Sequence, residues 1–236
     1  METLCSWAGN RLWGKRGIGE QVKKTVKIIK LDPVRPEAAF SRCREAISAG
    51  GVIAYPTDTF YGLGADPKSL RAVKKLFEIK GRPTVQPILL LIADPQDARQ
   101  WAADIPPQAD ELMKRCWPGP LTLILKARAD VLPELTAGTG TIGLRVPGNQ
   151  LTRDLLCFLG CALTGTSANR SGQTSFCTAR ETADAIGDRV DLILDGGATA
   201  GGKPSTIVDV RTGLPRVVRE GAVPLQDISV EAKSRQ

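Results

Sequence analysis

The chain has 236 residues, of which 42% are hydrophobic and 24% charged, and it contains no histidine. This length and apolar content predict one large globular domain or two small ones. The lack of histidine excludes Ser-His-Asp and Cys-His catalytic arrangements. No apolar run approaches the roughly 20 residues of a membrane helix, and residues 1–25 lack the apolar stretch of a secretory signal, so we expect a cytoplasmic protein without membrane contact.

The net charge of +7 is concentrated near the N-terminus. Residues 1–35 hold eight basic and three acidic residues, whereas the rest of the chain holds 24 basic and 22 acidic residues. A basic tail therefore sets the pI. We predict that residues 1–25 form a basic, disordered N-terminal extension. Its role stays open between a solvated extension or overlong translation start, an RNA-contacting arm and an organellar targeting segment.

Hydrophobic spacing and Gly/Pro punctuation predict alternating helices and strands in chain order. A helix is expected from Pro36 to Gly50-Gly51, then a strand over 52–55, then a helix capped by Asp66-Pro67 that ends at Lys80-Gly81 and buries Leu70. The apolar run 87–92 predicts a buried strand. Further helices are expected at Asp94-Pro95, at Pro106-Pro107, over 150–159 and after a Thr178/Glu181 capping box, and further strands over 121–125, 141–146, 161–164, 190–194, 206–210 and 216–218.

This alternation predicts a layered α/β domain with a mixed sheet and no internal repeat. No segment is rich enough in Gly, Pro or Ser to divide it, so we expect a single domain over 26–224 and a C-terminal tail over 225–236. Six cysteines are scattered without a CxxC pair, which favours reduced, mostly structural cysteines and gives no zinc site.

Four polar loops are expected where strands or helices end, over 56–64, 80–87, 165–172 and 203–209. Polar loops at strand ends commonly bind ligands in α/β sheets, and the alternative is ordinary turn chemistry. In the first loop, Thr57 and Asp58 are expected to shape the turn through bonds to its backbone. Tyr61 is expected to pack as a wall of a cleft.

The second and third loops carry residue types that bind phosphate. A helix dipole alone explains a cation at Lys80, whereas Arg82 on a proline-stiffened loop has no such structural reason. Together they suit a polyphosphate, although the chain has no GxxxxGK[ST] loop. The third loop offers hydroxyls and the Asn169 amide for an anion or for magnesium, and Ser167, with no neighbouring base, is interpreted as a binding residue.

Seven ordered segments resemble the YrdC-like threonylcarbamoyl-AMP synthases, over about residues 28–222. They are PTDTFYGLGAD, KGRP before a hydrophobic strand, WPGPLTLIL, LRVP, TSANRSG, STIVD and VVREGA. The resemblance, to the single-domain bacterial form, implies a strongly twisted mixed sheet flanked by helices, with a concave basic cleft. It also implies that L-threonine, bicarbonate or carbon dioxide and ATP yield L-threonylcarbamoyladenylate and pyrophosphate, for modification of tRNA beside the anticodon.

The resemblance further implies site residues. The catalytic residues would be Lys80, Arg82, Ser167 and Asn169. ATP would contact Arg82, Gln86, Thr141, Ser167, Ser175 and Arg219, and L-threonine would contact Thr59, Leu91, Arg145, Gly165 and Ser205. ATP is a substrate, Mg²⁺ would bind mainly through its phosphates, and no direct protein ligand to a metal can be assigned. Downstream tRNA threonylcarbamoyltransferase proteins would be partners, with tRNA itself a further contact.

Two positions depart from the family pattern, and two have structural alternatives. Gln86 replaces the usual Asn, and Leu91 stands where many relatives have histidine. Arg145 is the natural partner for the threonine carboxylate, the alternative being an arginine that extends to solvent. Arg219 could equally be a surface cation. A non-catalytic RNA-binding or ribosome-assembly factor is the alternative function, which the near-balanced charge of residues 36–236 and the 5% aromatic content disfavour.

Overall fold

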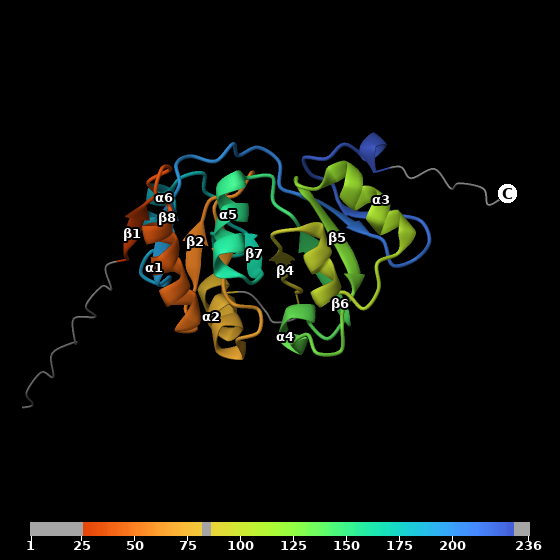
Figure 1. The fold of residues 1–236 in the computed structure, drawn as a ribbon, viewed down its shortest axis with the longest axis horizontal. Coiled ribbons are helices and arrows are strands. Elements are labelled where there is room, and N and C mark those ends of the chain that lie inside the picture. Colours follow the sequence, from red (N-terminus) through yellow and green to blue (C-terminus); the bar gives the residue numbers. More distant parts are fainter. Residues whose placement is uncertain (1–25, 82–85, 229–236) are drawn as a thin grey trace, which may run out of the picture.

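The computed structural model describes residues 26–81 and 86–228, in which ten strands form one mixed sheet (Figure 1). The strands are β1 (Ile28–Lys30), β2 (Ile53–Tyr55), β3 (Gly62–Gly64), β4 (Leu89–Leu91), β5 (Leu121–Lys126), β6 (Thr141–Arg145), β7 (Leu163–Ser167), β8 (Leu192–Asp195), β9 (Thr206–Asp209) and β10 (Arg216–Arg219). The α-helices are α1 (Glu37–Ser48), α2 (Leu70–Lys80), α3 (Pro107–Cys116), α4 (Pro133–Thr136), α5 (Gln150–Leu159) and α6 (Ala179–Ile186), and the 3₁₀ helices are η1 (Pro95–Gln100) and η2 (Leu225–Asp227).

The strand order is β1-β8-β2-β3-β7-β4-β6-β5-β9-β10, so strands distant in sequence become neighbours. Four neighbouring pairs are parallel, namely β1/β8, β8/β2, β4/β6 and β5/β9, and the other five are antiparallel. In Figure 1, β1, β8 and β2 lie at one end of the molecule and β5 and β6 toward the other. The expected mixed α/β architecture is confirmed.

Helices cover both faces of the sheet because its strands are apolar on both faces. In and next to β2, Val52 and Ala54 belong to one buried cluster, whereas Ile53 and Tyr55 belong to a second. This is the period-two alternation of a strand. Side chains of α1 and α5 complete the second cluster, and side chains of α2, α3 and α6 belong to the first. A continuous apolar run such as 52–55 is therefore a strand buried on both sides.

The expected loop over 56–64 is partly wrong, because its last three residues form β3. A Gly-Leu-Gly strand has weak intrinsic propensity, since glycine offers no side chain to pack. Tyr55 supplies that packing from the neighbouring strand. A Cβ on Gly64 would lie 2.6 Å from the Tyr55 ring atom Cε1, so the ring occupies the space that the glycine leaves. Antiparallel pairing of Tyr55 with Gly62 fixes this register.

The helix starts were predicted with one error. The side chain of Ser69, rather than Asp66, caps α2 by accepting from the Ala72 N–H, and Asp66 instead accepts from the Lys68 N–H in the preceding turn. Leu70, expected on the buried face, is exposed because it is the first residue of the helix. The Thr178/Glu181 capping box of α6 is confirmed, and Asp94 forms a similar box on η1.

Two further boundaries differ from the expectation. The strand expected over 161–164 is β7, which continues to Ser167, so that the first three residues of the expected loop 165–172 lie within the sheet. The extension occurs because β7 pairs on both sides, with β3 and with β4. No helix or strand was expected between the strands at 121–125 and 141–146, whereas the structure has the short helix α4 there. The expected helices at 36–50, at Pro106-Pro107 and over 150–159 are confirmed as α1, α3 and α5.

Candidate active site

A cavity of about 760 Å³ lies against the middle of the sheet, lined by residues of β2 to β7, β9 and β10 and by the segments that follow them. All the described residues that were predicted to bind a substrate or act in catalysis contribute to its lining. They are Thr59, Lys80, Gln86, Leu91, Thr141, Arg145, Gly165, Ser167, Asn169, Ser175, Ser205 and Arg219. Arg82, predicted for catalysis and for ATP, lies outside the described residues. The fold thus gathers side chains from segments spread between residues 59 and 219.

The charged lining of the cavity is basic. Within the described residues its charged members are Lys80, Arg145 and Arg219, and no carboxylate is among them. Partial burial of the Arg219 guanidinium lowers its pKa below the usual value, and the nearby positive charge of Arg145 lowers it further. An arginine still stays protonated at neutral pH. The cavity therefore presents fixed positive charge, which favours an anionic ligand.

Lys80, Ser167 and Asn169 form one hydrogen-bonded cluster. The Lys80 Nζ donates to Asn169 Oδ1 at 2.8 Å and to the Ser167 carbonyl oxygen at 2.7 Å. The Ser167 hydroxyl donates to the same Asn169 oxygen at 2.6 Å. Asn169 turns its Nδ2 to the carbonyl of Gln173, which orients its oxygen toward the ammonium. Lys80 and Asn169 are 4% and 5% exposed, so this cation is held at a defined position in the wall.

The backbone conformation at the end of α2 explains how Lys80 enters the wall. Gly81 follows it in the left-handed region at φ 56°, which ends the helix directly after Lys80. Glycine adopts this conformation at little cost. The loop between β7 and α6 also contacts this end of the helix, because the Ser171 N–H donates to the Lys80 carbonyl. The predicted catalytic residues Lys80, Ser167 and Asn169, from two separate segments of the sequence, therefore meet here.

The turn between β2 and β3 carries Thr57 and Thr59. The Thr57 Oγ1 accepts from the N–H groups of Thr59 and Phe60 and donates to the Phe60 carbonyl, so its expected turn-shaping role is confirmed. The Thr59 and Thr57 hydroxyl oxygens are 3.2 Å apart. Tyr61 lines the cavity, as expected, and its hydroxyl donates to the Gly197 carbonyl. Thr59 thus presents its side chain to the cavity from a rigid turn.

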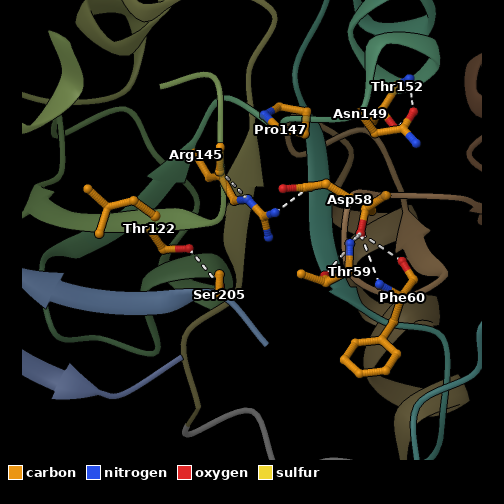
Figure 2. A network of polar contacts seen from close by, with 12 residues as sticks. Asp58, Thr59, Phe60, Thr122, Arg145, Pro147, Asn149, Thr152 and Ser205 are labelled. Carbon is orange, nitrogen blue, oxygen red and sulfur yellow. Dashed lines mark hydrogen bonds and ion pairs between the residues drawn. The ribbon is translucent and has the colours of Figure 1, made fainter. Parts of the chain in front are cut away.

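Asp58 does not shape this turn, contrary to expectation. Its Oδ1 accepts from Arg145 Nη2, in an ion pair that Figure 2 shows spanning the space between the turn and the end of β6. The Arg145 Nε donates to the Gly119 carbonyl at 3.0 Å. Arg145 is 5% exposed, so it does not extend to solvent. Its guanidinium is fixed in the wall of the cavity.

Ser205 joins the ends of β5 and β10. Its hydroxyl oxygen is 3.1 Å from Thr122 Oγ1 and accepts from Arg219 Nη2 at 3.1 Å. Figure 2 draws the contact between Ser205 and Thr122. Arg219 also donates to the Ser205 carbonyl oxygen through Nε and Nη2. Arg219 is exposed as a residue, as the surface-cation alternative requires, yet its guanidinium is anchored at the cavity. It therefore lies at the rim.

Sequence reasoning missed two polar residues of this network, Asp58 and Thr122. Thr122 is 1% exposed in the apolar strand β5, and a polar residue inside a run buried on both faces is the signal that could have found it. Asp58 lies beside Thr57 and Thr59 in a turn-forming segment, where turn chemistry accounts for an aspartate equally well. Its partner Arg145 is 87 residues away in sequence.

Among residues 26–81 and 86–228, no three His, Cys, Asp or Glu side chains converge in a way that could hold a metal ion. Over the same ranges, no helix combines the length and apolar character needed to cross a membrane. The five cysteines of this part of the chain are free thiols.

Comparison with known proteins identifies the family. The Sua5/YciO/YrdC family model, described as "Telomere recombination", matches residues 45–221. The chain belongs to the Sua5/YciO/YrdC family. The resemblance of the seven sequence segments is thereby confirmed.

The chain is similar to several threonylcarbamoyl-AMP synthases. The chain is 38% identical over 183 residues to that of Pyrococcus abyssi and 40% identical over 178 residues to that of Bacillus subtilis, which covers 77% and 75% of this chain. It spans only about half the length of these two relatives, 54% and 51%. The threonylcarbamoyl-AMP synthase of Thiobacillus denitrificans is 38% identical over 164 residues, which is 70% of this chain and 87% of that relative.

Solved structures of the Sua5/YciO/YrdC family share the fold. Sua5 of P. abyssi, solved in complex with L-threonine, superposes with a TM-score of 0.82 at 35% identity, over 85% of this chain and 59% of that one. YciO of Escherichia coli superposes with a TM-score of 0.77 at 32% identity, over 86% of this chain and 98% of that one. The fold is therefore that of both Sua5 and YciO.

Proposed function

We propose that the protein is an L-threonylcarbamoyladenylate synthase, which forms threonylcarbamoyl-AMP and pyrophosphate from L-threonine, bicarbonate or carbon dioxide, and ATP. One observation carries this proposal. The described residues predicted to contact threonine and those predicted to contact ATP line a single cavity. The names of the relatives in P. abyssi and B. subtilis support the same reaction, and the L-threonine complex of P. abyssi Sua5 supports the amino-acid substrate.

Each predicted residue has a role that suits its surroundings. The Arg145 guanidinium would bind the threonine carboxylate, with the Ser205 hydroxyl beside it. Lys80 and Arg219 would bind the ATP phosphates, and Arg82 would add a further cation. Thr59 would contact threonine from the opposite wall. The remaining predicted ATP contacts are Gln86, Thr141, Ser167 and Ser175, and the remaining threonine contacts are Leu91 and Gly165.

The reaction needs no nucleophile from the protein. The threonine amine attacks carbon dioxide, or bicarbonate with loss of water, and the new C–N bond gives a carbamate. A carbamate oxygen then attacks the α-phosphorus of ATP, and the bond to the bridging oxygen breaks so that pyrophosphate leaves with its electron pair. The protein's contribution is to bring three small molecules together and to stabilise the negative charge that grows at phosphorus, for which Lys80 is well placed.

Magnesium would bind mainly through the triphosphate. The described lining of the cavity offers hydroxyl and amide oxygens but no carboxylate, which fits an ion that keeps most of its contacts to water and phosphate. When bound, it would neutralise phosphate charge.

We also propose that residues 26–224 form the catalytic domain, and that the product passes to tRNA threonylcarbamoyltransferase proteins that modify tRNA. The disordered character of residues 1–25, the tail at 225–236 and the cytoplasmic location stay predictions.

A pyrophosphate-release assay with purified protein tests the proposal. Release should require ATP, L-threonine and bicarbonate together, whereas release without threonine would contradict it. Lys80→Ala should lower turnover by at least about 100-fold, because a positioned charge is a large catalytic term. Lys74→Ala is the matched control, since Lys74 is an exposed lysine of the same helix, and it should keep normal turnover. Salt-sensitive RNA binding without any pyrophosphate release would favour the RNA-binding alternative.

A further inference from the structure

Asp58 has a largely buried carboxylate that the proposed chemistry has not used. Its side chain is 17% exposed, and its Oδ2 is fully buried without a hydrogen-bond partner within the described residues. That oxygen packs against Gly148, where an added Cβ would come within 3.0 Å of it. Leaving a carboxylate oxygen buried and unpaired is costly, and such a group in a folded protein calls for an explanation.

The local backbone does not need Asp58. Thr57 already accepts from the Phe60 N–H, which lies two residues after Asp58 and is the donor that an aspartate turn at this position would use. A buried ion pair is also weak evidence for a stabilising role, because desolvation of both charges offsets their attraction. The ion pair with Arg145 is therefore better explained by its effect on the orientation of the Arg145 guanidinium.

Asp58 and Gly119 together fix the orientation of the Arg145 guanidinium. The Gly119 carbonyl accepts from Nε and the Asp58 carboxylate accepts from Nη2, so two of the three nitrogens of the planar group are held from outside the cavity lining. Within the described residues Nη1 has no hydrogen-bond acceptor. A planar fork anchored at two nitrogens has little freedom to rotate, and Arg145 itself lines the cavity. Its remaining N–H groups are available to a ligand in a fixed direction.

We propose that Asp58 is a positioning residue that directs Arg145 to the carboxylate of the amino-acid substrate. This rests on the proposed function, because it assigns Arg145 to L-threonine. Asp58 would also keep the two anionic groups of the substrates, the threonine carboxylate and the ATP phosphates, at different arginines. Arg145 and Arg219 line the same cavity, and their anchors differ, because Asp58 holds Arg145 at the turn whereas Ser205 holds Arg219 at the rim. With Asp58 in place, Arg145 is reserved for the carboxylate.

Binding of L-threonine and of a non-hydrolysable ATP analogue, each measured by calorimetry, tests this role. Asp58→Ala should weaken threonine binding by about tenfold or more, the loss expected when a hydrogen bond to a charged group is removed. ATP-analogue binding should stay within about twofold. Asp58→Asn keeps an oxygen that can accept from Arg145 Nη2, and it should recover most of the threonine affinity. Asp66→Asn, in an exposed turn of the same segment, should match the wild type.

The preference for threonine over threoninamide gives a second readout, because threoninamide lacks the carboxylate. This preference should be large in the wild type and in Asp58→Asn and should shrink in Asp58→Ala. A wild-type protein that binds neither ligand would refute the proposed function itself. Unchanged threonine affinity in Asp58→Ala, an equal loss for both ligands, or no recovery in Asp58→Asn would each overturn the positioning role while leaving the proposed function intact.

Discussion

The hydrogen-bond partners of the Ser205 hydroxyl, Arg219 and Thr122, determine the direction in which its O–H can donate. Its oxygen accepts from Arg219, which can only donate, and it lies 3.1 Å from Thr122 Oγ1. If Thr122 donates as well, both lone pairs of Ser205 are used and its own O–H is left for an acceptor in the cavity. A carboxylate bound by Arg145 is such an acceptor. Thr122 would then prepare Ser205 to donate to the substrate.

Thr122→Val tests this arrangement. Valine has nearly the same shape as threonine but cannot donate, so the change removes about 1 kcal/mol of hydrogen bonding without creating a large cavity. We predict that the KM for threonine rises about fivefold while kcat changes less than about twofold. Steady-state kinetics with varied threonine measures this. Thr182→Val, at a buried threonine of α6 away from the cavity, is the control, and an unchanged KM in Thr122→Val would contradict the account.

For single residues, the sequence could predict those whose side-chain type alone indicates a binding or catalytic role. Lys80, Arg145 and Arg219 are cations beside polar loops, and the segments around them resemble a known family. Asp58 and Thr122 could not be predicted in the same way because their roles depend on Arg145 and Ser205, which are 87 and 83 residues away in sequence. Their significance arises only when the sheet brings these strands together.

Among the elements, the hairpin of β9 and β10 matters most for the rim of the cavity. Ser205 lies directly before β9, and Arg219 ends β10. Asp209, at the other end of β9, accepts from Arg211 Nε and Nη2 at 2.9 and 2.7 Å, and Arg216 of β10 lies 3.5 Å away. These bonds lower the pKa of Asp209 from its ordinary value of 3.8 to about 2. The carboxylate therefore ties the loop of the hairpin to its strands.

This shift in pKa predicts how stability depends on pH. Because the pKa of Asp209 is lower in the folded state, its stabilising effect is complete above about pH 4 and is lost as the pH falls toward 2. At pH 7, Asp209→Asn should lower the free energy of unfolding by on the order of 2 kcal/mol. Its difference from the wild type should shrink between about pH 4 and pH 2 in urea unfolding experiments. A difference that does not change with pH would contradict this, and Asp130→Asn, an exposed ion-pair partner, should show little effect.

Most elements could be predicted because their boundaries are local. Helices α1, α3, α5 and α6 carry proline, asparagine or threonine at their starts and apolar residues at helical spacing. Strand β3 could not be predicted, because its glycines become a strand only under the ring of Tyr55. The extent of β7 likewise depends on two partner strands. Strand β3 and the end of β7 were missed because strand pairing, rather than their own sequence, fixes them.

For the whole molecule, the lining of the cavity reaches from Tyr55 to Arg219. Strand order explains this, because β7 and β4 join the half of the sheet that begins at β1 to the half that ends at β10. Among the described residues the lining begins at Tyr55, and β1, which follows the basic segment 1–25 in the sequence, pairs with β8 at the edge of the sheet. We therefore expect the proposed reaction not to require the basic N-terminal segment.

Deletion of residues 1–25 tests this separation. We predict that the shortened protein keeps kcat and both KM values within about twofold, because the proposed catalytic residues lie between 59 and 219. Deletion of residues 1–31 also removes β1 and leaves the edge of β8 unpaired, so it should lower the melting temperature. Kinetics and thermal melts of the two truncations measure these effects. A large loss of turnover on removal of residues 1–25 alone would show that the basic segment takes part in the reaction.

The most direct test of the central claim is the identity of the product. Purified protein is incubated with ATP, L-threonine and ¹³C-bicarbonate, and the nucleotide products are separated and weighed by mass spectrometry. We predict threonylcarbamoyl-AMP that carries the heavy carbon, with its amount depending on Lys80 and Arg145. Only AMP, or an adenylate of threonine without the heavy carbon, would contradict the account, because the carbamate would then not be the group that attacks ATP.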